Sequence, residues 1–355
     1  MIPPMSMNQS SPYPMLSIIV PVYNAQDYII RCLESIVAQT YQGDVECILV
    51  DDCSTDQSTQ RIDQFISSYQ GCFEFKLIHL DQNQGPSGAR NAGVKASRGE
   101  LFAFVDSDDW IEPNMYEELY RLLSQDPKAL FVTSGIIAET PTGTEYGHAN
   151  TDKYEEGGTI EPYPFLELLL ATKTNYSIYN KLYRREFFTI PFREGIMVGE
   201  DLLFFYDNCK VLIGQDCHFL TTPRAYYHYI IHPGSIMHQD TQSPKQWYVD
   251  TLVTMTYVLD DSQNTYPNLY KIQLNRFATV FGHHFYEIVN NKALTTLRKD
   301  MLTKLNKYVR VMDKHKFSLM TRIDMLIASN VPNGYRWVCN IAKFRKCIKL
   351  LNKSK

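Results

Sequence analysis

The sequence predicts a doubly wound α/β domain followed by an α-helical C-terminal region. Four short apolar runs, rich in β-branched and aromatic residues, predict strands buried on both faces: residues 16–22, 45–50, 75–80 and 101–105. Segments with apolar residues at helical spacing separate these runs, and this alternation is typical of a mostly parallel sheet with helices on both faces. From about residue 245 the pattern is helical throughout.

The prediction of each helix is based on a particular set of residues. The first presents one apolar face made of Ile29, Cys32, Leu33, Ile36 and Val37. The second presents a similar face made of Ile62, Phe65, Ile66 and Tyr69. Small residues that follow Gly85-Pro86-Ser87 form a third helix, and Pro113 stands where a fourth begins. Beyond about residue 130 the pattern is irregular, with helices near 162–172 and 200–213.

We expect an N-terminal extension (1–14), an α/β domain (15–240, in halves 15–125 and 126–240) and a helical region (241–355). Hydrophobic residues make up 44% and charged residues 21%, which excludes a disordered or collagen-like chain. The eight cysteines form no CxxC pair, so we expect reduced thiols rather than a metal finger. Without an apolar run of roughly 18 residues or a signal-peptide pattern, the chain is expected to be cytoplasmic.

Charge is unevenly distributed along the chain. Residues 292–355 hold 16 basic and 3 acidic side chains, whereas residues 1–291 hold 19 basic and 36 acidic ones. A basic tail on an acidic body predicts an anionic partner. In residues 336–355 one helical face is apolar (Trp337, Ile341, Phe344, Ile348 and Leu351), as in helices that lie in a membrane interface. The alternative is that this face packs on the helical region; no motif supports nucleic-acid binding.

Polar clusters follow all four predicted strands, at residues 21–24, 51–56, 83–93 and 106–109. Ligands bind outside the carboxyl ends of the strands in an open parallel sheet, so we expect the clusters at one edge. Each cluster alone has a structural explanation, such as capping of the next helix. Asp106 and Asp108 together predict an oxygen-rich site for Mg²⁺ or Mn²⁺, completed by ligand phosphates. No GxGxxG follows the first strand and no P-loop motif is present, which disfavours dinucleotide binding and excludes a P-loop.

The order of these segments resembles the family 2 glycosyltransferases of the GT-A fold, of the bacterial polysaccharide type. The matching segments are PVYN (21–24), VDDCSTD (50–56), NQGPSGARNAG (83–93) and FVDSDD (104–109). Three further segments continue the likeness in order: NKLYRR (180–185), GED (199–201) and YHY (227–229) with the SIM that follows at 235–237. The likeness covers roughly residues 15–240, and it implies a GT-A fold and glycosyl transfer.

The resemblance implies a role for each matching position. Val22 and Asn24 would line the nucleotide pocket, and Asp51 or Asp52 would accept the uracil N–H. The Gly85 loop and Arg90 would close over the uridine and diphosphate. The remaining implied roles belong to three acids: Asp106 at the ribose or the metal, Asp108 as ligand of Mn²⁺ or Mg²⁺, and Asp201 as catalytic base.

Several positions keep two interpretations. By its residues alone Asp201 is either a base or a first-turn acid that the helix dipole favours; the resemblance favours the base. Ile230 and His232 stand where relatives often have two arginines, so His232, and less so His228, would replace a diphosphate contact or a metal ligand. Lys181 and Glu200 would contact the acceptor or the diphosphate, or Lys181 would form a structural ion pair.

The leading interpretation is an inverting, metal-dependent glycosyltransferase, of the hexosyltransferase type. Its donor would be a nucleotide-sugar, and the implied uridine contacts favour a UDP-sugar. Its acceptor would be a saccharide or a lipid-linked saccharide. The acceptor would bring the chain to the inner face of the cell membrane. A sugar-nucleotide pyrophosphorylase and an inactive nucleotide-binding scaffold are the alternatives. An inactive scaffold would be expected to have lost the acids of the site. All four are present: Asp52, Asp106, Asp108 and Asp201.

Overall fold

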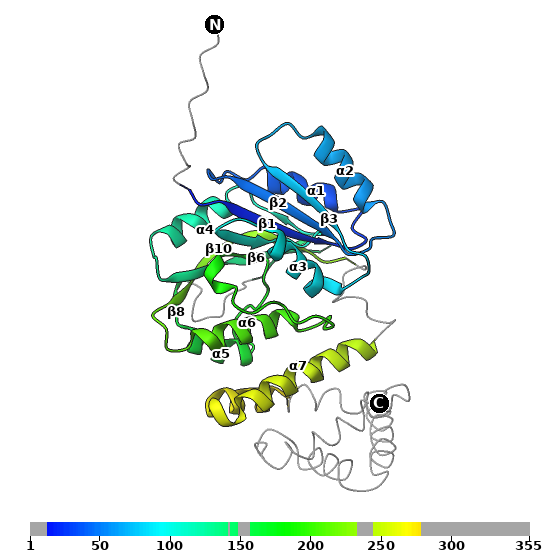
Figure 1. The fold of residues 1–355 in the computed structure, drawn as a ribbon. Helices are drawn as coiled ribbons and strands as arrows, with labels where there is room; N and C mark the ends of the chain where they lie inside the picture. The colour runs from blue at the N-terminus through cyan, green and yellow to red at the C-terminus, as the bar shows by residue number, and fades with distance from the viewer. Residues whose placement is uncertain (1–12, 141–142, 148–156, 233–243, 278–355) are drawn as a thin grey trace, which may run out of the picture. The chain divides into compact units, whose positions relative to one another are not determined.

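The strands and helices predicted for the first 125 residues form at those places in the computed structural model (Figure 1). The strands are β1 (Leu16–Val22), β2 (Val45–Asp51), β3 (Glu74–His79) and β4 (Leu101–Phe104). The helices are α1 (Ile29–Val37), α2 (Ser58–Ser68), α3 (Gly85–Ala96) and α4 (Met115–Ser124). The structure describes residues 13–140, 143–147, 157–232 and 244–277.

Helices cover both faces of this part of the sheet, as the sequence predicts. On one face Ile18 of β1 and Cys47 of β2 join a buried apolar cluster with residues of α1, α2 and α4. On the other face Ile48 and Val50 of β2 pack against Ala89 of α3. Figure 1 shows α1 and α2 on one side of the strands and α3 on the other. The doubly wound α/β class is therefore confirmed.

A glycine sets how closely α3 approaches the sheet. A Cβ at Gly93 would lie 2.4 Å from Ile19 Cγ2, which no real side chain tolerates. The absence of a side chain at Gly93 lets α3 lie directly on β1 and β2. The polar residues at the start of α3 are thereby held close to the carboxyl ends of both strands.

The domain contains further strands that the sequence pattern does not predict, the first of them before residue 125 and the rest in the second half. They are β5 (Trp110–Ile111), β6 (Ala129–Thr140), β7 (Gly143–Gly147), β8 (Gly158–Ile160), β9 (Lys181–Arg184) and β10 (His218–Ile230). The helices expected near 162–172 and 200–213 are confirmed as α5 (Pro162–Leu170) and α6 (Glu200–Leu212), with a 3₁₀ turn, η1 (Arg185–Phe187), between them.

The ten strands of the described residues belong to one mixed sheet. Its main path runs β3-β2-β1-β4-β9-β6-β10-β5, with β7 beside β6 and β8 beside β10. The pairs among β1, β2, β3 and β4 are parallel, and so is the pair of β6 with β10. Strand β9 is antiparallel to both β4 and β6, so it joins the two parallel parts.

An aromatic cluster holds α5 and α6 against the sheet. The Phe131 ring of β6 stacks on Phe219 of β10 with centroids 4.1 Å apart, and it also contacts Phe165 of α5 and Phe205 of α6. Rings in such arrangements contribute beyond the area that they bury. The cluster fixes the axis of α6 and therefore the position of its first turn.

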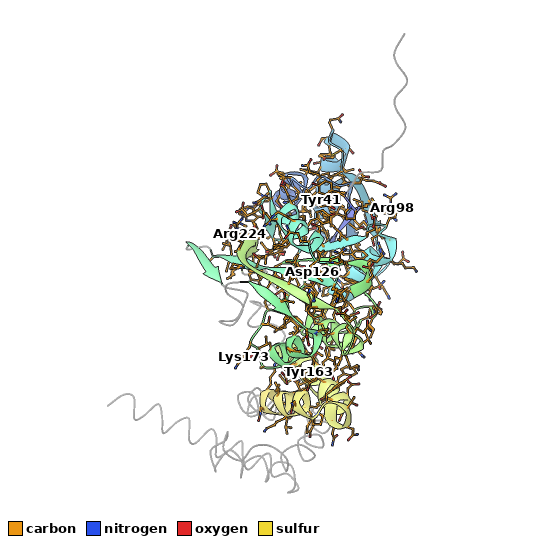
Figure 2. The ribbon with its side chains drawn as sticks, turned by 90° about the vertical axis from the view of Figure 1, so that its left-hand side faces the viewer. Tyr41, Arg98, Asp126, Tyr163, Lys173 and Arg224 are labelled. Carbon is orange, nitrogen blue, oxygen red and sulfur yellow. The ribbon has the colours of Figure 1, made fainter. Side chains whose placement is uncertain are left out.

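A group of polar side chains lies where β1 and β2 begin, at the opposite end of these strands from the predicted site. The Ser17 hydroxyl donates to Glu46 Oε1 at 2.6 Å, and Arg98 donates to Glu46 through its backbone N–H at 2.6 Å and through Nε at 3.1 Å. Figure 2 labels Arg98 at the surface, while Glu46 is buried. Burial opposes ionisation of Glu46, but the hydrogen bonds from Ser17 and Arg98 outweigh it, and its pKa is lowered.

The chain separates into two compact units, residues 1–239 and 240–355. In the second unit α7 (Pro244–Thr265) buries Leu252, Met255, Val258 and Leu259 at helical spacing, and residues 267–277 are also helical. The predicted amphipathic segment 336–355 lies outside the described residues. No helix in the described ranges is both long and apolar enough to cross a membrane.

Candidate active site

The polar clusters that follow β1 and β2 meet at one edge of the sheet. The Asp52 N–H donates to the Val22 carbonyl at 2.8 Å. Asn24 adopts a left-handed conformation (φ 51°), which asparagine tolerates better than most residues. Its side-chain oxygen accepts the Thr55 N–H at 2.8 Å. Val22, Asn24 and Asp52, three predicted nucleotide contacts, are therefore neighbours.

Asp51 and Asp52 are both buried but have different partners. Asp51 accepts the Ser54 N–H at 3.1 Å and lies 3.2 Å from the Nδ1 of His79. Asp52 accepts the Gln84 N–H at 2.6 Å. Burial raises the pKa of Asp52, opposed by backbone hydrogen bonds. Asp52 thus ties the β2 end to the loop that opens α3.

Gly85 begins α3 in a left-handed conformation (φ +72°) that strongly favours glycine. A Cβ there would lie 3.0 Å from the sulfur of Met197. Its N–H donates to the Asn83 side chain at 3.2 Å. The predicted Gly85 loop is therefore a tight turn between Asp52 and the segment that leads to α6.

Arg90 lies in a carboxylate cluster rather than on the surface of this loop. It is 4% exposed. Its Nη1 donates to Glu200 Oε1 at 3.1 Å and to Asp201 Oδ1 at 3.3 Å, and its Nη2 donates to Asp106 Oδ1 at 3.1 Å. One guanidinium thus joins the end of β4 to the first turn of α6. We call Arg90, Asp106, Glu200 and Asp201 the arginine cluster.

The acids of the arginine cluster are unusually basic. Burial raises the pKa of Asp106 and of Glu200. Burial and the neighbouring Glu200 raise the pKa of Asp201 to about 8, against the opposing effect of Arg90. Gly199, and not an acid, occupies the N-cap of α6, with φ 87°. Asp201 therefore stands in the first helical turn with its carboxylate directed to Arg90.

Lys181 is fully buried next to the arginine cluster. Its amine donates to Asn180 Oδ1 at 2.8 Å and to the Ser177 carbonyl. No carboxylate forms an ion pair with it among the described residues. Burial lowers the pKa of Lys181 to about 7, although Asp201 opposes the shift. In this structure the buried amine thus donates to the loop before β9, and a contact of Lys181 with the acceptor or the diphosphate stays a prediction.

Asp108 of the β4 loop and His232, which follows β10, contact each other. The Asp108 Oδ2 and His232 Nε2 atoms are 3.0 Å apart, and the imidazole stacks on Tyr28 at 4.4 Å between centroids. This distance is that of a hydrogen bond or ion pair, which the two side chains would exchange for bonds to a cation if one bound here. In the described ranges no three His, Cys, Asp or Glu side chains form a metal site by themselves. A cation here would also need oxygens from its ligand.

Two residues without a role assigned from the sequence organise the β4 loop. Asp109 is buried and accepts the Tyr227 hydroxyl at 2.8 Å and the Ile230 N–H at 2.7 Å. Burial and the nearby Asp108 and Asp106 raise its pKa well above the usual range. The Asp106 N–H in turn donates to the Tyr227 hydroxyl at 3.1 Å. In the sequence, Asp109 is the last acid of the DSDD segment and Tyr227 the first tyrosine of the YHY segment, and these positions could have identified both residues.

His228 belongs to a separate packed group. Its two ring nitrogens lie 2.9 Å from carboxylate oxygens of Glu139 and Glu112, and the ring stacks on Trp110 at 3.4 Å. Arg31 covers the Trp110 ring at 4.6 Å from the centroid. These contacts give His228 a structural role and separate it from the Asp108–His232 pair.

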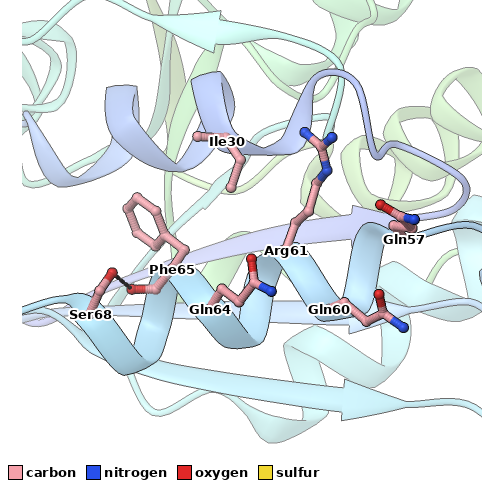
Figure 3. Close-up of a pocket in the computed structure, with 7 residues that line it drawn as sticks. All are labelled: Ile30, Gln57, Gln60, Arg61, Gln64, Phe65 and Ser68. Atoms are coloured by element: carbon pink, nitrogen blue, oxygen red, sulfur yellow. Dashed lines mark hydrogen bonds between the residues drawn. The ribbon is translucent and has the colours of Figure 1, made fainter.

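A cavity of about 390 Å³ lies elsewhere, between α1 and α2 (Figure 3). Its lining consists of Ile30, Gln57, Gln60, Arg61, Gln64, Phe65 and Ser68. None of these side chains is a carboxylate, and none belongs to the strand-end clusters. This cavity is therefore distinct from the candidate active site.

Comparison with known proteins gives one family. Residues 17–192 match Glycosyl transferase family 2. EpsH of Bacillus subtilis (strain 168), which bears a glycosyltransferase name, is 32% identical over 229 residues, or 63% of each chain. Glycosyltransferase GlyA of Streptococcus pneumoniae serotype 4 is 30% identical over 274 residues, which cover 73% of this chain and 38% of GlyA. The chain thus spans less than two thirds of the length of either relative.

The fold has solved counterparts. Residues 1–349 of S. aureus TarS, crystallised in complex with UDP-GlcNAc, superpose with a TM-score of 0.65 at 21% identity. The match covers 93% of this chain and 91% of the TarS chain. This likeness supports the GT-A fold that the sequence predicts. The family match includes all four strand-end clusters, and it assigns residues 17–192 to glycosyl transferase family 2.

Proposed function

We propose that the chain transfers a sugar from a nucleotide-sugar, a UDP-sugar, to a saccharide or lipid-linked saccharide acceptor with inversion at the anomeric carbon. The observation that carries this proposal is the arginine cluster. It places Asp106, from the end of β4, and Asp201, from the start of α6, on one guanidinium. Metal-assisted glycosyl transfer needs acids of these two kinds in one site, one group beside the diphosphate and one beside the acceptor.

Asp201 is the proposed general base. The acceptor oxygen forms a bond to C1 of the donor sugar while the bond from C1 to the diphosphate oxygen breaks, and the Asp201 carboxylate takes the acceptor proton. One displacement from the face opposite the leaving group inverts C1. A pKa of about 8 makes this carboxylate a far stronger base than an exposed aspartate.

Asp108 and His232 are the proposed protein ligands of Mn²⁺ or Mg²⁺, with Asp106 beside them. When bound, such a cation neutralises charge on the leaving diphosphate. The contact between Asp108 and His232 places a carboxylate and an imidazole side by side, which supports the pairing. Val22, Asn24, Asp51, Asp52 and the Gly85 loop are the proposed nucleotide contacts. The choice of uridine draws on the UDP-GlcNAc complex of TarS.

Two measurements on the full chain test the proposal. Calorimetry with UDP, with and without Mn²⁺, is expected to show binding that strengthens with the metal. A panel of UDP-, GDP- and dTDP-sugars is expected to show metal-dependent release of nucleotide from UDP-sugars, abolished by excess EDTA. Binding of no nucleotide would support the inactive scaffold. Formation of a UDP-sugar and pyrophosphate from UTP and a sugar 1-phosphate would support the pyrophosphorylase.

The acceptor class leads to a proposal for the tail. Residues 336–355 combine an apolar helical face with seven basic residues, among them Arg345, Lys346, Lys349 and Lys353. Each basic residue near an anionic leaflet adds roughly 1 kcal/mol of membrane binding. We expect the full chain to co-sediment with anionic vesicles, and truncation after residue 335 and added salt to weaken the binding sharply. Equal co-sedimentation of the truncated chain would mean that the tail only packs.

A further inference from the structure

Three of the five N–H donors of Arg90 are committed to carboxylates in this structure. Its Nη1 serves two carboxylates, Glu200 and Asp201, and its Nη2 serves a third, Asp106. Its Nε is buried without a hydrogen-bond partner. One face of the guanidinium lies 5.7 Å from the centroid of the Phe192 ring. A phosphate would have to reach the donors that remain, the buried Nε and the second N–H of Nη2, or displace one of these acids.

We propose that Arg90 is a positioning residue for Asp201 and Asp106, and not a contact of the donor diphosphate. This inference rests on the proposed function, because the base and the donor site are defined by it. The geometry is that of a clamp: one planar cation fixes two carboxylates that come from opposite halves of the domain. Only arginine offers donors in such a fixed fork.

The residue after Arg90 acts on the same segment of chain. Asn91 donates from Nδ2 to the Phe192 carbonyl at 2.9 Å, and its Oδ1 accepts the Phe192 N–H at 2.9 Å. This reciprocal pair holds the segment that leads into α6. Asn91 therefore positions the backbone before Gly199, while Arg90 positions the side chains directly after it.

Electrostatics explains why the clamp is needed. Three buried carboxylates that lie together repel one another and lose hydration, so without a cation they would protonate or separate. Lys181 is near Asp201 but donates to Asn180 and Ser177 instead. Arg90 is thus the one cation with direct hydrogen bonds to these acids among the described residues. Its loss would disturb the base and Asp106 together.

The test compares Arg90→Gln and Arg90→Lys with Arg193→Gln, all in the full chain. Arg193 is a matched control because its Nε pairs with Asp207 of the same helix, α6, at 2.7 Å, away from the arginine cluster. For Arg90→Gln we expect kcat to fall by about 10²-fold, the scale of a misplaced catalytic group. The Kd of UDP with Mn²⁺ should change much less, by under about tenfold, because Asp106 is one of several proposed donor-site contacts whereas Asp201 is the single proposed base.

Arg90→Lys keeps the positive charge but not the forked set of donors, so we expect its kcat to lie between those of Arg90→Gln and the wild type. Arg193→Gln should keep the wild-type kcat. Wild-type kcat at saturating donor in Arg90→Gln, with UDP binding weakened tenfold or more, would overturn the clamp and favour a diphosphate contact. If Arg90→Gln does not fold, the same comparison is made on Arg90→Lys. A wild-type chain that binds UDP but transfers no sugar would overturn the proposed function, and this inference with it.

Discussion

The two ends of the parallel strands both carry buried acids beside an arginine, yet the acids behave in opposite ways. At the amino ends Glu46 alone receives the Ser17 hydroxyl, an N–H and Arg98 Nε, and its pKa is lowered. At the carboxyl ends Asp106, Glu200 and Asp201 share the single Arg90, and the pKa of each is raised.

The two ends differ in the number of hydrogen-bond donors available to each carboxylate. Glu46 has three donors for one carboxylate, so its charge is compensated and stabilises the fold. The arginine cluster has one cation for three carboxylates, so the acids retain affinity for protons. A group that must accept a proton during a reaction benefits from the second arrangement. We therefore expect substitutions at the carboxyl ends to affect catalysis and those at the amino ends to affect stability.

The largest effect is expected from Asp201→Asn. The amide cannot accept the acceptor proton, so kcat should fall by about 10³-fold, within the usual range for a lost general base. The affinity for UDP should be nearly intact, because a base acts only as the transition state is approached. Steady-state rates and calorimetry measure both quantities. A variant that no longer folds would instead identify Asp201 as a structural first-turn acid.

Asp108→Asn is expected to have the second-largest effect on turnover. It removes a charged ligand from the Asp108–His232 pair, and turnover should fall by about 10²-fold, as when electrostatic stabilisation of a transition state is lost. UDP binding should become less dependent on Mn²⁺ than in the wild type. Rates and titrations over a series of Mn²⁺ concentrations provide the measurement. Full wild-type activity in excess EDTA would contradict a metal role for this end of the sheet.

The pH dependence should show a smaller effect. A base with a pKa of about 8 is active when deprotonated, so kcat/KM should rise with pH and level off above about pH 8. At pH 7 the rate should be about tenfold below the plateau, because about a tenth of the base is then ionised. The profile of wild-type kcat/KM between pH 6 and pH 9.5 tests this. A flat profile across this range would show that Asp201 is already ionised in the active protein.

Glu46→Gln should have the smallest effect on transfer, with kcat unchanged. Its cost is in stability: the loss of charged hydrogen bonds should lower the free energy of unfolding by about 1.5–3 kcal/mol at neutral pH. Because the pKa of Glu46 is lowered in the fold, this stability is present above the unfolded-state pKa and is lost as the pH falls through the folded one. Denaturant titrations at pH 7 and in acid measure it. A large fall in kcat would show that the two ends are coupled.

The first half of the domain was largely predictable from local patterns. Apolar runs and helical spacing are short-range signals, and β1, β2, β3, β4, α1 and α3 begin and end close to the predicted residues. The second half was not, because its strands pair across long separations and carry irregularities. Strand β10 contains Pro223 and shifts register against β6 at several points, so no regular alternation marks it.

The sequence by itself determined which acids stand at the ends of strands, since the carboxyl ends of neighbouring parallel strands share one edge. Only the tertiary structure decided which of them meet. Arg90 and Asp201 lie 111 residues apart in the chain, and their contact depends on two features of packing. Gly93 lets α3 approach the sheet, and the Phe131 cluster fixes the start of α6. Such contacts follow from how whole elements pack, and no local pattern of residues encodes them.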